Sequence, residues 1–384
     1  MRSIKNICVI TSRYPTYIDP TAQVFVQQFA WELADLGLAC TVVCPVPINI
    51  EFRKGVNLPY RTVEKTDAGN TVTVFFPKYF GFGQRNIYIT NTALFTLNTF
   101  NKSVKRVFNT LKKKPDAVYG HFISPSGVVA ARMGRDFGIP AFVAYGESTP
   151  WSVRNLGREK VLEELSTVAG IVSVSEENKN KLVELELINK EKIAVFPNAV
   201  RLEHFYPRLQ KEARIKFDIP PDIFVVAFVG HFIKRKGVDK VLEAINQIDG
   251  VYGIFAGKGP LKPMGKKTLY SGLVSPSDMP WFLSSADIFV LPTANEGCCN
   301  AILEAMACGL PIVTSDKPFN YDILHKNDAI FVDPENETEI VQAIINLRDH
   351  CKHRETLSQR SLQMARTFGY KKRVSNIVDW IEAN

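Results

Sequence analysis

Short apolar runs that alternate with helical patterns restrict this chain to a narrow class of folds. The first run, residues 7–11, precedes a segment over 23–36 whose apolar residues recur at helical spacing. Another run follows at 39–44, and further runs begin near 117, 141 and 170. Strands that are apolar along most of their length belong in a parallel sheet that helices cover on both faces. The pattern therefore predicts an α/β fold with a doubly wound parallel sheet.

A polar, proline-marked segment at 202–221 interrupts this series, and we interpret it as a linker and interdomain hinge. A second series begins at 224–229 and continues with predicted strands at 252–256, 269–272, 288–291, 312–314 and 329–332. We therefore expect two doubly wound domains in tandem, residues 1–202 and 203–367. Ligands bind beyond the carboxyl ends of the strands in such sheets, so two domains of this kind favour a ligand cleft between them.

Composition and cysteine spacing exclude several classes of protein. The chain has 384 residues, which is long enough for two full cores. No apolar run reaches the roughly 20 residues that a bilayer span needs, and the first run is too short for a signal peptide. The seven cysteines are an odd number without Cys-x-x-Cys spacing, which argues against a disulfide framework and against a zinc site. We therefore expect a cytoplasmic protein.

The net charge of +8 is unevenly spread along the chain. Residues 68–115 contain no Asp or Glu, while the part at 78–114 carries eight Lys or Arg among several aromatic side chains. A basic surface with interleaved aromatics suits an anionic partner, and we favour a membrane surface or a lipid phosphate. Two alternatives stay open: a solvated helix whose aromatics belong to the core, and nucleic acid, for which the sequence shows no module signature.

Two turns of the second domain have features of an anion site. A strand expected to end at Gly230 leads into a turn with Arg235 and Lys236, and a helix follows. Free amides, the helix dipole and cationic side chains together favour phosphate at such a helix start. The next strand ends in a turn that begins at Gly257, where a glycine lets a ligand approach the backbone closely. The alternative for both turns is an ordinary surface connection.

The segment 295–311 holds Glu296 in a loop and Glu304 in an otherwise small and apolar helix. We expect this helix to run from about Asn300 to Cys308. Ionised carboxylates bind vicinal hydroxyls well, so these two acids are suited to two different diols. Phosphate on amides and cations, with diols on carboxylates, describes a sugar nucleotide. The loop that would supply the amides consists of Gly297, Cys298, Cys299 and Asn300. The alternative is a solvated loop acid and a helix-surface acid.

These motifs resemble those of a GT-B glycosyltransferase of the large retaining group, glycosyltransferase family 4. Glu296 and Glu304 stand at the family's Glu-x7-Glu spacing, and the resemblance extends over most of the chain. Supporting segments are 172–176, 196–200, 229–237, 257–260 and 273–291. The resemblance implies two Rossmann-like domains facing across a cleft, the first binding the acceptor and the second the donor. It also implies that a C-terminal helix, 368–384, crosses back to the first domain.

The family also implies roles for individual residues. Glu296 would contact the donor sugar, Glu304 the nucleotide ribose, and Lys236 the diphosphate. The family's diphosphate-binding arginine is replaced here by His231, and Arg235 is the candidate that supplies the missing cation.

The first domain departs from the family at one position, because Gly146 stands where several members carry a histidine involved in catalysis. Glu147 and His121, both at expected strand ends, become the local candidates for a catalytic role. For His121 the alternative is a structural hydrogen bond, and for Glu147 it is an acid at a helix start.

A front-face mechanism with retention is what the family implies, in which the leaving diphosphate helps to deprotonate the incoming hydroxyl. Lys236, Arg235 and the loop amides would stabilise the charge of that leaving group. The sequence contains no Asp-x-Asp, which argues against a metal clamp, and we expect neither a metal nor another cofactor.

The sequence therefore predicts a hexosyltransferase that moves a hexose from a nucleotide-diphosphate sugar to a lipid-linked or polymeric saccharide acceptor. A UDP-sugar is favoured only because UDP is the more frequent donor in the family. Such an enzyme would work in surface polysaccharide or glycoconjugate biosynthesis, as a peripheral protein on the inner face of the plasma membrane. Two alternatives stay open: another GT-B enzyme such as an epimerase, and a non-catalytic protein that binds sugar nucleotides.

Overall fold

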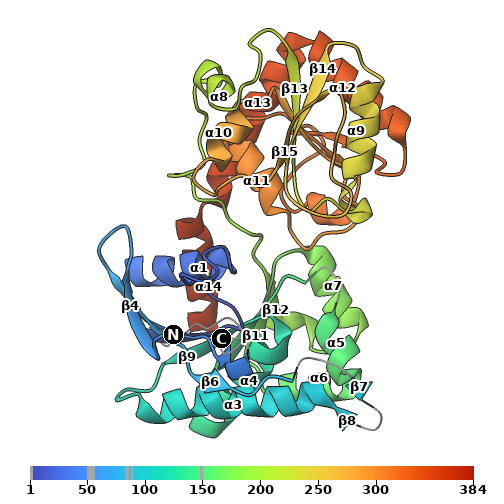
Figure 1. Ribbon diagram of the computed structural model, residues 1–384. Coiled ribbons are helices and arrows are strands. Elements are labelled where there is room, and N and C mark those ends of the chain that lie inside the picture. Colours follow the sequence, from blue (N-terminus) through green and yellow to red (C-terminus); the bar gives the residue numbers. More distant parts are fainter. Residues whose placement is uncertain (1–2, 50–56, 83–85, 88–89, 148–149) are drawn as a thin grey trace. The chain divides into compact units, whose positions relative to one another are not determined.

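The computed structural model describes residues 3–49, 57–82, 86–87, 90–147 and 150–384. The chain forms two compact units: Met1–Phe196 together with Tyr370–Asn384, and Pro197–Gly369 (Figure 1). Each unit is built on its own mainly parallel sheet. The α/β class with two doubly wound domains, predicted from the alternating pattern, is thereby confirmed.

The sheet of the first unit has eight strands in the order β12-β11-β10-β9-β1-β2-β5-β4. All neighbours are parallel except the pair β4 and β5. Their bounds are β1 Asn6–Ile10, β2 Ala39–Val43, β4 Arg61–Lys65, β5 Thr71–Phe75, β9 Ala117–His121, β10 Ala141–Tyr145, β11 Gly170–Ser173 and β12 Ile193–Val195. Two short pairs lie outside it: β3 Val46–Pro47 with β6 Lys78–Tyr79, and β7 Asn86–Ile87 with β8 Thr90–Asn91.

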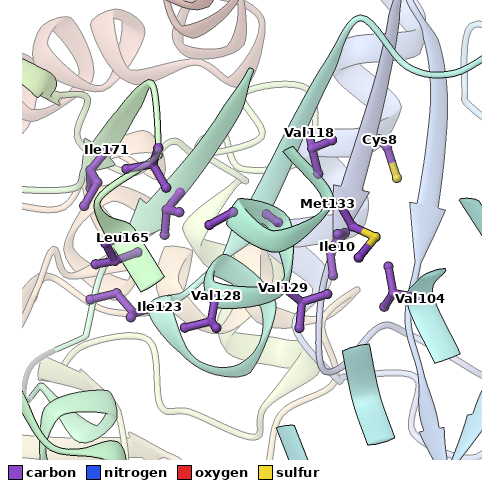
Figure 2. Packing of buried hydrophobic residues seen from close by; sticks show 14 of the residues in the cluster. Cys8, Ile10, Val104, Val118, Ile123, Val128, Val129, Met133, Leu165 and Ile171 are labelled. Carbon is purple, nitrogen blue, oxygen red and sulfur yellow. The ribbon is translucent and has the colours of Figure 1, made fainter. Parts of the chain in front are cut away.

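Both faces of this sheet are buried, which explains why its strands are apolar along their length. Cys8 and Ile10 belong to one core and Ile7 and Val9 to the other, because successive side chains of a strand point to opposite faces. Figure 2 shows the first of these cores. Its helices include α3 Thr92–Thr110, α4 Val128–Phe137, α6 Arg158–Leu165 and α7 Glu176–Glu184, with α5 Trp151–Leu156 and the short turn η1 Ile123–Gly127 beside them. The opposite core contains α1 Val24–Asp35 and α14 Tyr370–Ala383.

The sheet of the second unit has six parallel strands in the order β15-β14-β13-β16-β17-β18. Their bounds are β13 Phe224–Val229, β14 Val251–Ala256, β15 Thr268–Gly272, β16 Ile288–Leu291, β17 Ile312–Ser315 and β18 Ile330–Val332. The helices are α8 Gln210–Lys216, α9 Val238–Asn246, α10 Met279–Ser284, α11 Asn300–Ala307, α12 Glu337–Asp349 and α13 Cys351–Ala365. The strand order reverses between β13 and β16, so the carboxyl ends of these two strands form the topological switch point where ligands bind in such sheets.

The segment that we expected to be a linker, 202–221, packs on the second unit. The Arg214 side chain within it is almost fully buried, and its guanidinium hydrogen-bonds Asp287 Oδ2 at 2.9 Å and the Ser285 carbonyl at 3.1 Å. The units therefore divide after Phe196 and again after Gly369, whereas the expected boundaries were 202/203 and 367/368.

The C-terminal helix α14 completes the first unit. Trp380 lies against β11 at Gly170, where a Cβ atom would come within 2.3 Å of the indole ring, and its ring is 5.5 Å from that of Phe142. At the same end of the unit, the backbone N–H of Ile4 donates to Glu382 Oε1 at 2.8 Å. Gly170 is thus required for the docking of α14.

We therefore expect Gly170→Ala to lower the free energy of unfolding by about 1–3 kcal/mol through overpacking against Trp380. Urea denaturation measures the loss. In a Trp380→Leu background the same substitution should cost clearly less, because the nearest clashing atoms are gone. An equal cost in both backgrounds would show that Trp380 does not determine the requirement for glycine.

Candidate active site

The first part of the site is the turn between β13 and α9. Lys236 ends a short turn, η3 Lys234–Lys236, and Gly237 follows with a left-handed backbone (φ 72°) before α9 begins. A Cβ atom on Gly237 would lie 2.7 Å from the carbonyl oxygen of Pro292, in the segment that follows β16. The missing side chain therefore lets the two turns of the switch point touch.

Contact between these turns brings Glu296 onto two cations. Its Oε1 forms an ion pair with Lys236 Nζ and lies 3.3 Å from Arg235 Nη1. The hydroxyl of Thr293 donates to the same oxygen at 3.1 Å. Only 13% of the Glu296 side chain and 12% of the Lys236 side chain are exposed, so both charges depend on each other for compensation.

Arg235 also fixes the backbone of the segment 293–300, which we call the donor loop. The carbonyl of Arg235 accepts the N–H of Ala294 at 2.8 Å, while its guanidinium donates to the Asn295 carbonyl. His231, at the position of the family's arginine, is exposed. Arg235 thus places one cation beside Glu296 and holds the loop in position.

The second half of the donor loop leads into α11. Gly297, Cys298 and Cys299 are buried, whereas Asn300 is exposed at the first position of the helix. The cap residue, Cys299, makes no side-chain cap hydrogen bond. The backbone N–H groups of Ala301 and Ile302 nevertheless lie against the Cys299 thiol, whose pKa burial raises and these two groups lower. A helix start of this kind suits an anion.

Glu304 lies one turn into α11 and differs from Glu296 in its surroundings. It is half-buried, and within the described ranges it forms no ion pair. Burial raises the pKa of Glu304 to about 7. Burial, and after it the charge of Glu304, raises the pKa of the Cys308 thiol at the C-cap of α11. A carboxylate without a cation is well suited to accept hydroxyl donors.

The glycines after β13 and β14 pack against neighbouring backbone. A Cβ atom on Gly257 would come within 1.9 Å of the carbonyl oxygen of Gly230, and one on Gly259 within 2.4 Å of the carbonyl oxygen of Phe232. The backbone N–H of Gly230 donates to the Ala256 carbonyl at 3.0 Å. The space beside Gly257 is therefore filled by neighbouring backbone, so this glycine is needed for packing between the two turns.

In the first unit, Glu147 follows β10. Burial raises the pKa of Glu147 to about 7, an effect that the backbone N–H groups of Trp151 and Ile123 oppose by donating to the carboxylate. Its Oε2 atom is buried and has no hydrogen-bond partner. At the preceding position, a Cβ atom on Gly146 would lie 3.1 Å from a methyl carbon of Val174, a crowded site for the histidine of other members.

His121 ends β9 inside a cluster of aromatic rings. Its imidazole centroid lies 5.5 Å from Phe25, 5.7 Å from Phe122, 5.8 Å from Tyr119 and 6.1 Å from Phe29. Burial, together with the charge of Arg373, lowers the pKa of His121 to about 3, and its Nδ1 is buried without a partner. The imidazole therefore stays neutral near pH 7.

The structure thus brings Glu296, Lys236 and Arg235 together, and places Glu304 on the helix that follows. Glu147 and His121 belong to the other unit. Sequence reasoning missed Thr293, which is fully buried and donates to Glu296. Its only signal was a position next to the end of a strand at the switch point.

The part of the chain that the structure describes contains no group of three or more His, Cys, Asp or Glu side chains able to hold a metal ion. Over the same residues, we find no helix whose length and hydropathy would let it span a bilayer.

Models of known protein families match both units of the chain. Residues 22–204 match the family model described as Glycosyltransferase Family 4, and residues 223–350 match the model described as Glycosyl transferases group 1. The chain belongs to glycosyltransferase family 4. It is therefore an enzyme of the hexosyltransferase class with the GT-B fold, and the family predicted from the Glu-x7-Glu spacing is confirmed.

Individual relatives agree with this family. A putative teichuronic acid biosynthesis glycosyltransferase, TuaC, of Bacillus subtilis (strain 168) is 26% identical over 352 residues, covering 88% of this chain and 88% of that protein. The UDP-Gal:alpha-D-GlcNAc-diphosphoundecaprenol alpha-1,3-galactosyltransferase of Escherichia coli is 27% identical over 275 residues, covering 65% of this chain and 70% of that protein. The crystal structure of Anabaena HepE in complex with UDP-glucose superposes with a TM-score of 0.71 at 13% identity over 99% of this chain and 100% of that one.

The raised pKa of Glu304 predicts how the free energy of unfolding depends on pH. Its folded pKa of about 7 lies above the ordinary glutamate value of 4.5, so the folded state holds the proton more tightly and this group's contribution to stability falls as pH rises from about 4.5 to 7. Relative to wild type, Glu304→Gln should therefore gain stability between pH 4.5 and pH 8, by up to about 3 kcal/mol. Urea denaturation at both pH values measures the gain, with the exposed Glu243→Gln as control. A difference that does not change with pH would contradict the assigned pKa.

Proposed function

We propose that this glycosyltransferase retains anomeric configuration and moves a hexose from a UDP-sugar to a lipid-linked or polymeric saccharide acceptor. The observation that carries the proposal is the Glu296 carboxylate held between Lys236 and Arg235 at the switch point of the second unit. This arrangement places an acceptor for sugar hydroxyls beside two donors for phosphate, as a nucleotide-diphosphate sugar requires.

In the proposed reaction, the bond between the anomeric carbon and the diphosphate oxygen breaks, and its electron pair leaves with the nucleoside diphosphate. The acceptor hydroxyl attacks from the same face, and its proton passes to a diphosphate oxygen. Lys236, Arg235 and the amides at the start of α11 stabilise the negative charge that develops on the leaving group. Glu296 orients the hexose through its hydroxyls.

Glu304 is proposed to hold the ribose. Two ribose hydroxyls would donate to its carboxylate, which lacks a cation in the described structure. Because hydrogen bonds to the charged form favour it, nucleotide binding should lower the pKa of Glu304 and release a proton near pH 7.

Glu147 is the group of the first unit that we propose to act at the acceptor. A carboxyl with a pKa of about 7 exchanges protons readily near neutral pH, and its Oε2 atom is unpartnered. His121, neutral and enclosed by aromatic rings, is better suited to shape the site than to carry charge.

The donor and acceptor classes are supported by what similar proteins are named for. The E. coli relative uses UDP-galactose and a diphosphoundecaprenol-linked acceptor, the Bacillus relative belongs to teichuronic acid biosynthesis, and Anabaena HepE binds UDP-glucose. These proteins make a UDP-sugar and a surface saccharide the favoured substrates here.

A membrane surface is the proposed place of action. Within the basic region 78–114, Phe100 and Phe108 are core residues, whereas Phe80, Phe82 and Phe95 are more than half exposed. The rings of Phe82 and Phe95 lie 5.0 Å apart. Arg85 and Tyr88, which also belong to this region, lie outside the described residues. Exposed aromatics near lysines favour adsorption to an anionic lipid surface, with the enzyme as a peripheral protein.

Removing either charge of the central pair should abolish most turnover. We expect Glu296→Ala and Lys236→Ala to lower kcat/KM for the best UDP-sugar about 100-fold or more, while the exposed Lys266→Ala of the same unit stays within about twofold. A thermal-shift series with UDP, GDP and ADP should show stabilisation by UDP, since a ligand of the folded state raises the melting temperature. Full turnover by folded Glu296→Ala would refute the assigned site, and stabilisation by GDP alone would refute the UDP donor.

The exposed aromatics give a separate prediction. Phe82→Ser/Phe95→Ser should weaken sedimentation with phosphatidylglycerol vesicles by at least about tenfold, because each buried phenyl contributes about 1.5–3 kcal/mol. The matched control, Tyr60→Ser, removes an aromatic that is also exposed in the same unit but lies outside 78–114. Wild-type binding should be weaker to phosphatidylcholine vesicles and at high salt. Equal binding by the double variant would exclude this patch as the lipid contact.

A further inference from the structure

Asn198 connects the donor loop to the segment in which the chain enters the second unit. It lies two residues after Phe196, where the first of the two segments of the first unit ends. Its backbone N–H donates to Cys298 Sγ at 3.3 Å, and its side-chain Nδ2 donates to the Cys298 carbonyl at 3.1 Å. One asparagine thus holds both the side chain and the backbone of Cys298.

This contact complements the one made by Arg235. Arg235 fixes the first half of the donor loop, at Ala294 and Asn295, whereas Asn198 fixes the second half at Cys298. Glu296 lies between these two attachments. The amides that lead into α11 follow directly after the second one. The geometry of both the sugar-binding carboxylate and the phosphate-binding amides therefore depends on the two attachments.

The segment around Asn198 is itself well fixed. The backbone N–H of Val200 donates to the Phe368 carbonyl at 2.9 Å, and Val200 forms a parallel bridge with Gly369, where the chain leaves the second unit. Within the first unit, Arg373 Nη2 donates to the carbonyl of Phe196 at 3.3 Å. Asn198 thus lies two residues before a backbone connection within the second unit, and this connection fixes the segment that supports the donor loop.

We infer that Asn198 is a positioning residue for the donor site, acting through Cys298 on Glu296 and on the amides of α11. The inference rests on the proposed donor role of this loop. Small displacements of groups that orient a reacting substrate are costly in rate, so loss of the attachment should reduce turnover without unfolding the protein. By linkage, a sugar nucleotide that stabilises the donor loop must also stabilise the attachment of this loop to the segment around Asn198.

The kinetic test compares Asn198→Ala and Asn198→Asp with wild type. Asp has the shape of Asn but cannot donate to the Cys298 carbonyl, so it also serves if the alanine variant does not fold. We expect each to lower kcat/KM for the UDP-sugar at least tenfold and to raise KM for the donor. Asn336→Ala is the matched control, because it removes the cap of α12 in the same unit and should leave kcat/KM within about twofold. Equal kinetics of Asn198→Asp and wild type would overturn the inference.

A second readout separates this inference from the proposed reaction. Without any ligand, amide hydrogen exchange at 297–301 should be at least tenfold faster in Asn198→Asp than in wild type, and unchanged in Asn336→Ala. In wild type, UDP should slow exchange of the Asn198 amide, which donates to Cys298. Faster exchange without any UDP-sugar turnover in wild type would support the positioning role and refute the proposed reaction. Unchanged exchange at 297–301 would refute the positioning role whatever the enzyme's activity.

Discussion

The contact between Gly237 and Pro292 is the constraint on which the proposed donor site depends. A glycine at this position lets the turn after β13 touch the turn after β16, across the point where the strand order reverses. Only then can Lys236, on one turn, reach Glu296, on the other. Both side chains of this ion pair are mostly buried, and Thr293 and Arg235 further fix the position of the Glu296 carboxylate. A site built at the ends of two central strands obtains its rigidity from the sheet.

Three carboxylates of this enzyme have been given different properties by their surroundings. Glu296 is compensated by two cations, whereas Glu304 is half-buried without one, and its pKa rises to about 7. Burial raises the pKa of Glu147 to about 7 as well, although two backbone N–H groups donate to its carboxylate. Two cations thus compensate the carboxylate proposed for the sugar contact, whereas burial raises the pKa of the two carboxyl groups proposed for ribose contact and for proton exchange.

Much of the fold could be predicted because its strands are buried on both faces, so that apolar runs such as 7–11 and 224–229 identify them directly. The pairing of Lys236 with Glu296 could not be predicted, since it depends on how closely two turns approach in space. Thr293 and Asn198 were missed because a hydroxyl and an amide carry no charge signal in a sequence. Polarity at 202–221 indicated exposure, but the buried pair of Arg214 and Asp287 determines that this segment packs on the second unit.

Composition alone also could not distinguish the buried aromatic side chains of the basic region 78–114 from the exposed ones. Phe100 and Phe108 follow helical spacing on the buried side of α3, while Phe95 on the same helix is exposed. Only the position of the helix on its sheet makes that distinction.

The docking of α14 has a consequence for how the chain is made. The first unit needs Val374, Ile377 and Ile381 for the core on one face of its sheet, and these residues follow the whole second unit in sequence. The second unit is contiguous, so every residue it needs has been synthesised before α14. During translation, the face of the first sheet that α14 covers stays open to solvent until the second unit has been made. That interval is the one in which the nascent chain most needs protection from aggregation.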